Sequence, residues 1–326
     1  MSTSMRAAIR TDYGPPERIA VTTVPKPVPG DHDLLVRVRA TTVNRTDCAN
    51  LTGRPLVMHL VLGVRHPREV RIGTDFAGEV VAVGSAVTAY RIGDRVCGFR
   101  DTGLGGQAEY ITIRQDGPLM TIPPGLDFAT AVASLEGGHY AYSFFRRSGV
   151  ESGDRVLVNG GSGAIGSALL QFAVACGARV TSTTAPEYLE AVAALGASRV
   201  MDYTSEDFTR SPAQYDYVFD AVGKSTFGRC RPILEERGIY ISSEAGPYLQ
   251  NVFYTLGTAL IRSGKRVLFP VPLSPKESLP FIRRQLEAGT FRPLLDDSRY
   301  TLDNIAEAYR YVMSGRKRGN VIVDVA

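Results

Sequence analysis

The spacing of hydrophobic and polar residues changes near residue 129, and each part of the chain predicts a different architecture. Before that point, short apolar runs separated by Pro and Gly predict strands at residues 6–9, 33–40, 76–84, 95–99 and 108–113. Such spacing is typical of a small, mostly antiparallel β domain. Residues 51–71 show no clear period and predict a long loop or a short helix over a cleft, since loops of this length are often functional.

From residue 129 onward, a helix at 129–147 is followed by a regular alternation of strands and helices. Strands are predicted at 156–159, 179–183, 215–221, 238–243 and 266–270, with helices at 163–176, 187–195 and 226–234 between them. Repeated strand and helix units imply a parallel, doubly wound sheet, so the fold class is α/β. After residue 272 the pattern predicts helices at 276–288 and 304–314 and a last strand at 320–324.

Three spaced glycines join the strand at 156–159 to the next helix, which is the layout of a dinucleotide-binding turn. In such a turn Gly161 permits the tight bend, Gly163 lets the backbone approach a pyrophosphate, and Gly166 lets the helix pack on the strand. The phosphates rest on free N–H groups of the helix. A glycine triple alone is a weak signal, but the strand before it and the amphipathic helix after it support the interpretation. We therefore predict cofactor contacts from Gly161, Ser162, Gly163, Ala164, Ile165 and Gly166.

Composition narrows the class of protein further. A chain of 326 residues, 44% of them hydrophobic, is long enough for two cores. The net charge of +4 comes from 37 basic and 33 acidic residues, a mild balance that argues against nucleic-acid and membrane-surface partners. The 4 cysteines form no Cys-x-x-Cys pair, so we expect reduced thiols in the cytoplasm. We expect no leader segment, because no charged and then apolar stretch stands at residues 1–20, and the apolar stretch at 252–261 is too short to span a bilayer.

Several motifs in fixed order resemble one known family, and they extend over nearly the whole chain. They lie at residues 5–9 (MRAAI), 13–17 (YGPPE), 43–47 (VNRTD), 72–80 (IGTDFAGEV), 93–98 (GDRVCG), 161–166 (GSGAIG), 195–197 (LGA), 202–203 (DY), 219–223 (FDAVG) and 315–323 (GRKRGNVIV). The set resembles the zinc-independent quinone oxidoreductase branch of the medium-chain dehydrogenase/reductases. Several motifs in order are far more specific than one glycine triple.

The resemblance implies both an architecture and an activity. It implies a GroES-like catalytic domain at residues 1–123, completed by residues 272–326, and a Rossmann nucleotide-binding domain at residues 124–271. The implied activity is hydride transfer from NADPH to a small-molecule substrate, a quinone or another activated, α,β-unsaturated carbonyl compound. Two alternatives stay open: a zinc-independent, NAD(P)-dependent alcohol dehydrogenase, and a non-catalytic protein that binds a dinucleotide, because a fold does not determine a function.

The choice between NADPH and NADH depends on the residues after the strand at 179–183. An acidic residue about 20 positions past the last glycine would bind the ribose diol of NAD and repel a 2′-phosphate. Thr184 lies there and is neutral, whereas Glu187 follows Pro186, where an acidic residue suits a helix N-terminus. We predict NADPH, and NADH stays an alternative through Glu187. The resemblance implies cofactor contacts at Thr183, Thr184, Tyr203, Ala221, Val222 and Gly223.

One branch of this family binds a catalytic zinc ion and the other does not. By resemblance, zinc alcohol dehydrogenases place a Cys in the segment at 43–47, His and Glu in the segment at 73–75, and a further Cys near 134–138. This chain has Asn44, Thr74 and Asp75 in the first two segments and no Cys in the third. A catalytic zinc needs three side-chain ligands and an open position. We therefore expect no metal site.

The resemblance places the substrate in a cleft between the domains, near Asn44, Asp47, Thr74 and the helix start at 135–140. Hydride transfer without a metal needs a hydrogen-bond donor for the developing oxyanion, and Tyr140 and His139 are the obvious proton donors in that set. Tyr140 also lies at helical spacing with other large side chains, so it can simply pack. Asn44 is interpreted as a polar contact or a loop-orienting residue, and Asp47 can pair with a nearby arginine.

The strand at 266–270 is the last of the nucleotide domain, so we expect it at a sheet edge. An exposed apolar edge must be covered or paired. The resemblance implies pairing of this edge across a two-fold axis, a contact that would bury Val267 and Phe269. Pro270 and Pro272 oppose such pairing, because each removes a backbone donor. The positive charges of Lys265 and Arg266 oppose it too. On balance we expect a homodimer.

Overall fold

The chain forms two compact units in a computed structural model that describes residues 3–56, 58–68, 70–244, 250–260, 264–269 and 271–325. Unit 1 comprises Met1–Glu136, Pro275–Glu287 and Leu295–Ala326, and unit 2 comprises Gly137–Ser274 and Ala288–Leu294. The sequence placed the first boundary at residue 123. The division lies later because α3 (Phe128–Ala133), whose residues 131–133 are buried, packs on strands of unit 1.

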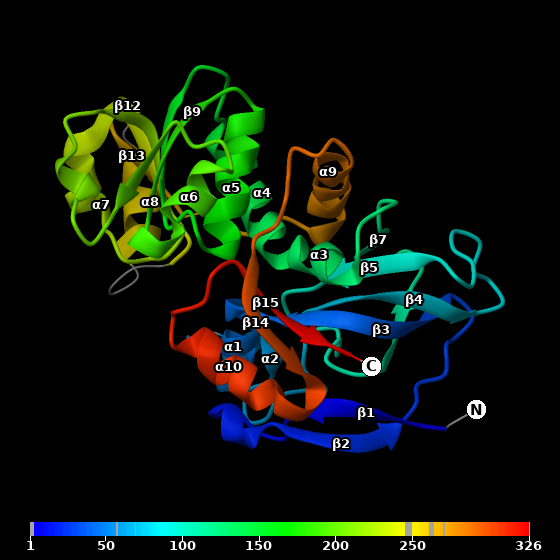
Figure 1. The fold of residues 1–326 in the computed structure, drawn as a ribbon. Helices are drawn as coiled ribbons and strands as arrows, with labels where there is room; N and C mark the ends of the chain where they lie inside the picture. Colours follow the sequence, from blue (N-terminus) through cyan, green and yellow to red (C-terminus); the bar gives the residue numbers. More distant parts are fainter. Residues whose placement is uncertain are drawn as a thin grey trace. The chain divides into compact units, whose positions relative to one another are not determined.

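Unit 1 is built on mostly antiparallel sheets, in which β14 and β15 are the one parallel pair among the described strands. β1 (Ser4–Ile9) and β2 (Ala20–Pro25) pair with each other, and a seven-stranded sheet has the order β14-β15-β3-β4-β5-β7, with β6 paired to β3. The strands of this sheet are β3 (Asp33–Val43), β4 (Asp75–Val83), β5 (Arg95–Phe99), β6 (Tyr110–Arg114), β7 (Leu119–Thr121), β14 (Leu295–Thr301) and β15 (Asn320–Asp324). Figure 1 shows the last strand beside β3, although nearly the whole chain separates them in sequence.

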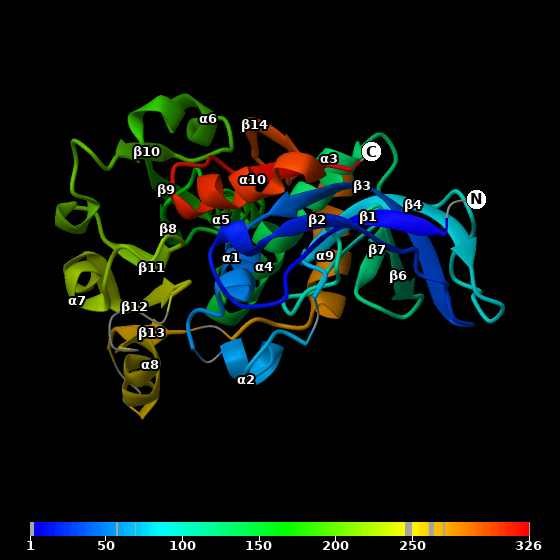
Figure 2. The same ribbon diagram turned by 90° about the horizontal axis from the view of Figure 1, so that it is seen from below.

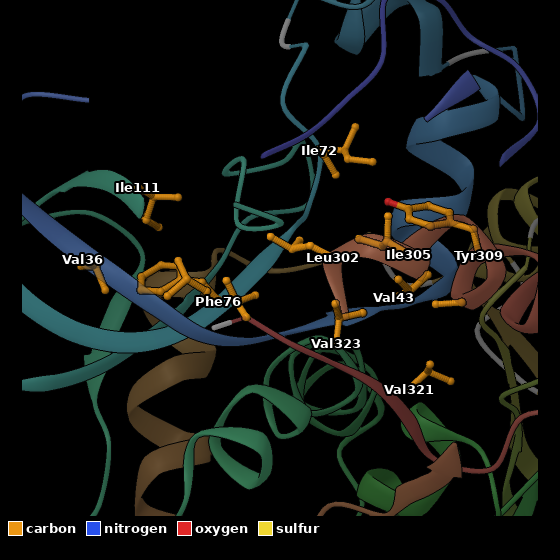
Figure 3. Packing of buried hydrophobic residues seen from close by; sticks show 14 of the residues in the cluster. Val36, Val43, Ile72, Phe76, Ile111, Leu302, Ile305, Tyr309, Val321 and Val323 are labelled. Atoms are coloured by element: carbon orange, nitrogen blue, oxygen red, sulfur yellow. The ribbon is translucent and has the colours of Figure 1, made fainter. Parts of the chain in front are cut away.

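The return of the C-terminus closes the core of unit 1. β15 pairs antiparallel with β3, so that Val321 lies opposite Val43. Figure 3 shows both side chains in one apolar cluster with Phe76 and Tyr309, and all four are at most 1% exposed. Burial of each such side chain stabilises the fold by about 1.5–3 kcal/mol, which ties the last strand to the first domain.

The helices of unit 1 are short. They are α1 (Arg45–Thr52), α2 (Met58–Leu62), α3, α9 (Pro275–Glu287) and α10 (Ile305–Met313), with one-turn 3-10 segments at Pro16–Arg18 and Leu302–Asn304. The region at 51–71, expected to be a long loop or a short helix, contains the end of α1 and the five-residue α2.

Unit 2 contains a six-stranded parallel sheet in the order β10-β9-β8-β11-β12-β13, which Figure 2 shows from one end of the order to the other. Its strands are β8 (Arg155–Asn159), β9 (Arg179–Thr184), β10 (Arg199–Asp202), β11 (Tyr215–Asp220), β12 (Leu234–Ser242) and β13 (Arg266–Leu268). This is the strand order of a Rossmann fold, in which successive strands are added first on one side of β8 and then on the other. Ligands of such sheets bind at the carboxyl ends of the strands, at this reversal point.

The helices of unit 2 are α4 (Leu135–Ser148, whose first two residues belong to unit 1), α5 (Ala164–Ala175), α6 (Leu189–Ala193), α7 (Phe227–Cys230) and α8 (Gln250–Leu260). The helix expected at 129–147 is two helices that meet at Ser134, whose Oγ donates to Ala131 O. The helix expected at 226–234 is shorter, because Arg231–Ile233, with Pro232 inside it, forms a 3-10 turn after α7. Of the helices that the structure describes, none has the length and apolar character to cross a membrane.

The strand expected at 266–270 is observed as β13 and ends at Leu268, while Pro270 lies outside the described residues. β13 is an edge strand, as predicted. The expectation that a partner subunit would bury Val267 is wrong. Its side chain is 3% exposed in the single chain, because it packs against Tyr240 and neighbouring residues in the core of unit 2.

Candidate functional site

The glycine turn of unit 2 leaves β8 and enters α5 at the carboxyl edge of the sheet. Gly160 N–H donates to Thr183 O (3.2 Å) and Oγ1 (3.1 Å), and Gly161 N–H donates to Thr183 O (2.9 Å). Gly163 is the N-cap of α5 and provides no side-chain hydrogen bond. The first N–H groups of a helix have no intrahelical acceptor, so this helix start offers backbone donors and a positive dipole end to an anion.

The structure shows which positions of the turn need a glycine, and some of the reasons differ from those that the motif suggested. The positive φ of the turn is at Gly160 (φ 94°), not at Gly161. Gly161 is required by packing, because a Cβ there would lie 2.1 Å from Ser182 Oγ. At Gly166 a Cβ would lie 2.1 Å from Gly160 O, which agrees with the predicted close approach of helix and strand. A Cβ at Gly163 would meet its nearest atom at 3.4 Å, so packing within the chain does not require a glycine there.

A buried polar network holds the ends of three strands together beside this turn. Asn159 at the end of β8 accepts a hydrogen bond from Thr183 Oγ1 of β9 (2.6 Å) and donates through Nδ2 to Asp220 Oδ1 of β11 (2.9 Å). All three side chains are buried. Sequence analysis did not identify Asn159 or Asp220; the available signal was a polar residue at the end of a predicted buried strand, or next to its end. The network fixes the edge where the reversal of strand order places a ligand.

Asp220 also organises the loop that follows β11, where Ala221, Val222 and Gly223 were predicted to contact the cofactor. Its carboxylate accepts from Val222 N (3.3 Å), Gly223 N (3.0 Å) and Ser225 N (2.8 Å). Gly223 has φ 68°, a conformation that favours glycine. The loop is therefore held at the carboxyl edge by one carboxylate, with Gly160 close enough that a Cβ on it would touch Val222.

The end of β9 is neutral, as the sequence predicted. Thr183 Oγ1 is used within the fold, whereas Thr184 Oγ1 is buried and has no hydrogen-bond partner among the described residues. Glu187 is exposed in the first turn of the 3-10 segment Pro186–Tyr188, the position expected of an acidic residue near a helix start. Tyr203 is 57% exposed, and its N–H donates to Thr184 O (3.2 Å).

The nearest carboxylate in register with Thr184 is that of Asp202, at the end of β10. Its oxygens accept from Thr204 N (2.8 Å), Thr204 Oγ1 (2.7 Å) and Ser205 Oγ (3.2 Å), and these bonds hold the pKa of Asp202 below its ordinary value. The carboxylate of Asp202 is therefore engaged in hydrogen bonds within its own turn. The glycine cradle, the start of α5 and the unpartnered Thr184 hydroxyl together fit a dinucleotide.

A second polar cluster lies in unit 1, where Asn44 and Asp47 begin α1. Asn44 Oδ1 accepts from Asp47 N (2.8 Å), and Asp47 Oδ2 accepts from Asn44 N (3.1 Å), which is a capping box. Asn44 Nδ2 donates to Thr74 Oγ1 (2.9 Å), and Asp47 Oδ1 accepts from Thr74 N (2.9 Å). Both predicted residues thus orient the loop around Thr74, and a direct role of either in catalysis stays a prediction.

Asp75, which follows Thr74, accepts several hydrogen bonds from β3. It accepts from Thr41 Oγ1 (2.9 Å), Thr42 N (2.8 Å) and Thr42 Oγ1 (2.5 Å). Burial raises the pKa of Asp75, and burial together with the charge of Asp75 raises the pKa of Asp47. Each carboxylate accepts bonds from N–H or O–H donors, which favour the charged form and offset part of this effect.

These residues do not fit a zinc ion. The amide of Asn44 is engaged with Asp47 N and Thr74 Oγ1, so its side chain has no oxygen directed at a metal. Among the described residues, no group of three or more His, Cys, Asp or Glu side chains is placed to hold a metal ion. A zinc site needs such a set.

His139 and Tyr140 lie next to each other on α4 in unit 2, and their rings meet edge to face with centroids 5.3 Å apart. His139 is fully buried, whereas Tyr140 is half-buried. Gly137, earlier in the same helix, packs so closely on α5 that a Cβ would lie 2.7 Å from the backbone of Ala164. The start of α4 is therefore next to the start of α5. The neighbouring Glu136 belongs to unit 1, where it accepts from Thr46 Oγ1 (3.0 Å).

Two family models match this chain. Residues 30–124 match the alcohol dehydrogenase GroES-like domain, and residues 195–323 match the family described as zinc-binding dehydrogenase. The family description of the second match implies zinc, whereas the donor set around Asn44 and Thr74 does not fit that ion.

Curated relatives extend over most of the chain. The 2-methylene-furan-3-one reductase of Solanum lycopersicum is 29% identical over 98% of this chain and 79% of its own. The chloroplast envelope quinone oxidoreductase homolog of Arabidopsis thaliana is 29% identical over 92% of each chain. The chloroplastic NADPH-dependent alkenal/one oxidoreductase of the same plant is 27% identical over 98% of this chain and 79% of its own. Among solved structures, the quinone oxidoreductase from Coxiella burnetii has the same fold, with a TM-score of 0.84 at 24% identity over 99% of this chain and 100% of its own.

The parallel sheet with its glycine turn, the GroES-like unit and these matches define an NAD(P)-dependent oxidoreductase. More specifically, the two matched domains and the relatives support the quinone oxidoreductase-like branch of the medium-chain dehydrogenase/reductases.

Substitution of two glycines by alanine separates packing from ligand binding. Gly166→Ala should lower the free energy of unfolding by about 1–3 kcal/mol, since its Cβ would collide with Gly160 O. Gly163→Ala should leave stability nearly unchanged but weaken NADPH binding, because the methyl group would occupy the space that a pyrophosphate approaches. Urea denaturation and fluorescence titration measure the two effects. Gly228→Ala, where an added Cβ meets nothing within 4 Å, is the control. A Gly166→Ala protein as stable as the wild type would contradict this account.

Proposed function

We propose that this protein is an NADPH-dependent, zinc-independent reductase that transfers hydride to quinones or other activated, α,β-unsaturated carbonyl compounds. The observation that carries the proposal is the glycine turn at the carboxyl edge of the sheet, where α5 begins without a side-chain cap. The relatives support the substrate class, since their names describe a quinone oxidoreductase homolog, an alkenal/one oxidoreductase and a methylene-furanone reductase.

NADPH is proposed over NADH because the end of β9 is neutral. A ribose-binding carboxylate at Thr184 would repel a 2′-phosphate, and this chain has there a buried hydroxyl with no partner among the described residues. Two carboxylates lie nearby. Glu187 is in the first turn of a 3-10 segment, and Asp202 accepts hydrogen bonds from its own turn. One relative is described as NADPH-dependent.

When bound, the nicotinamide cofactor supplies the hydride, and the chain must supply the remaining functions. The backbone donors at the start of α5 would bind the pyrophosphate. A hydrogen-bond donor must meet the negative charge that develops on the carbonyl oxygen. We assign this role to Tyr140, because its side chain is half-buried, while the adjacent His139 is fully buried.

The proposed activity predicts NADPH oxidation that depends on an added acceptor. The protein should reduce at least one member of a panel of benzoquinones, naphthoquinones and α,β-unsaturated ketones. Tyr140→Phe should lower kcat by about 10²-fold, the loss expected when a proton donor is removed. Tyr300→Phe, in unit 1, is the control and should leave kcat unchanged. Tight NADPH binding without turnover of any acceptor would instead identify a dinucleotide-binding protein.

The cofactor preference predicts a charge effect at the end of β9. The wild-type protein should bind NADPH more tightly than NADH. Thr184→Asp should reverse this order, because it places negative charge beside the 2′-phosphate. Fluorescence titration with both nucleotides measures the dissociation constants. A wild type that binds NADH as tightly or more tightly disproves the preference, and loss of NADH binding in Glu187→Gln would then identify Glu187 as the ribose ligand.

Metal independence predicts that chelation has no effect. Exhaustive dialysis against a chelator should leave kcat unchanged, and elemental analysis should find well under one zinc per chain, because Asn44 and Thr74 cannot replace a Cys and a His ligand. Stoichiometric zinc together with activity lost on chelation would overturn the zinc-independent assignment.

We also propose that two copies associate through the β13 edge of unit 2. α8 packs beside β13, and Phe269 N–H donates to Thr255 Oγ1 of this helix (2.9 Å). α8 exposes Phe253 (65%) and Leu256 (64%), large apolar side chains that a second copy would cover. Open strand edges with apolar neighbours are normally paired or covered.

Light scattering after size exclusion tests this association. The wild type should elute as a dimer at micromolar concentration, and Leu256→Lys should dissociate it, because two like charges would approach each other across the two-fold axis. Val267→Lys is unsuitable as an interface probe, since it would place a charge in the core. A species of 35.3 kDa that persists at high concentration would exclude the dimer.

A further inference from the structure

Unit 1 contains a basic cavity of about 260 Å³ that the proposed reaction does not use. It lies where β6 and the start of β3 face the loop at 100–104. Three arginines and one acidic residue line it: Arg71, Arg100, Arg114 and Asp33. Three positive charges and one negative charge leave an excess of +2 in a concave, partly enclosed space.

The charged side chains of this cavity differ in how far other groups of the protein neutralise them. Arg114 Nε donates to Asp116 Oδ1 (2.9 Å), so part of its charge is compensated at the rim. Asp33 Oδ2 accepts from Gly30 N (3.1 Å) and is directed into its own turn. Arg71 lies along the backbone of the adjoining loop, since a Cβ on Gly105 would be 3.5 Å from Arg71 Nε. Guanidinium groups bind oxyanions through charge-assisted hydrogen bonds.

A second, smaller cavity adjoins the first, and Arg71 and Gly103 line both. Its volume of about 10 Å³ has room for one water molecule. Arg10 (5% exposed) and Asn50 (7% exposed) line it, and Arg10 Nε and Asn50 Oδ1 are buried atoms without a hydrogen-bond partner among the described residues. One of these atoms is a donor and the other an acceptor, the kind of groups that buried waters bind in proteins.

The buried guanidinium of Arg10 adds positive potential behind the larger cavity. Arg10 Nη1 donates to Asn50 O, and its guanidinium lies 5.3 Å from the centroid of the Tyr13 ring. Burial lowers the pKa of Arg10, and the nearby Tyr309, Tyr13 and Asp47 offset part of this effect. An anion in the larger cavity would lower the electrostatic cost of this buried charge as well as that of the lining arginines.

We propose that the cavity lined by Arg71, Arg100 and Arg114 binds a small oxyanion, of the carboxylate or the phosphate class. The volume is large enough for a dicarboxylate or a phosphate ester. The position in unit 1 makes the site independent of the nucleotide turn, which belongs to unit 2. Because the cavity exists only in the folded protein, the bound anion should stabilise unit 1.

Calorimetric titration of the full chain with inorganic phosphate and with succinate, in chloride buffer of constant ionic strength, tests the proposal. One of the two anions should bind with one site per chain in unit 1, and the tighter of them identifies the class. Arg100→Gln should weaken this binding about tenfold, the effect of one charge-assisted hydrogen bond, and Arg71→Gln/Arg100→Gln should abolish it. Arg91→Gln, at a side chain that is 90% exposed outside the cavity, is the matched control and should bind as the wild type does.

The variants distinguish this site from adventitious binding at the nucleotide turn. Phosphate that binds in unit 2 would bind equally to the wild type and to the Arg71/Arg100 double variant. Equal affinity in those two proteins, or no binding of either anion to the wild type, would overturn the proposal. Arg100 is exposed, so its substitution should not disturb folding, and a thermal unfolding curve in chloride buffer confirms that the variant is folded.

Discussion

The side-chain amide of Asn159 is the interaction on which the nucleotide site depends. Its oxygen accepts from Thr183 and its nitrogen donates to Asp220, so one residue joins the carboxyl ends of the three strands around the reversal of strand order. Thr183 in turn accepts from Gly160 N–H, and Asp220 holds the loop at 221–225. Buried polar groups are costly unless each is satisfied. The same bonds that satisfy these groups therefore fix the position of the glycine turn.

Unit 1 uses a comparable arrangement at its own polar cluster. Asp75 collects donors from Thr41 and Thr42, while Asp47 caps α1 and holds Thr74 N–H. Both carboxylates are buried, and their pKa values are raised by burial, so each depends on the donors around it. In both units a buried carboxylate therefore positions backbone segments through its hydrogen bonds.

The sequence predicted those parts of the fold that carry a clear apolar run or a clear apolar and polar period. The final strand was predicted at 320–324 and is observed as Asn320–Asp324, because three of its residues are buried valine or isoleucine. β14, with the sequence LDDSRYT, and β10, with only four residues, were missed because neither has a readable apolar period. The neutral end of β9 could be predicted because it depends on residue identity alone. The sequence marks Asn159 and Asp220 only as polar residues near strand ends; their hydrogen-bond partners could not be predicted, since these follow from the parallel pairing of β8, β9 and β11, strands far apart in sequence.

The central claim is that this hydrogen-bond network holds the glycine turn in the geometry that binds NADPH. The most direct measurement is the NADPH dissociation constant of Thr183→Val, which keeps the side-chain size but removes the hydroxyl shared by Asn159 and Gly160. Thr181→Val, two residues earlier on β9, is the matched control. We expect about tenfold weaker NADPH binding in Thr183→Val. Circular dichroism should show a folded variant, and the control should bind NADPH as the wild type does. Unchanged NADPH affinity in a folded Thr183→Val protein would contradict it.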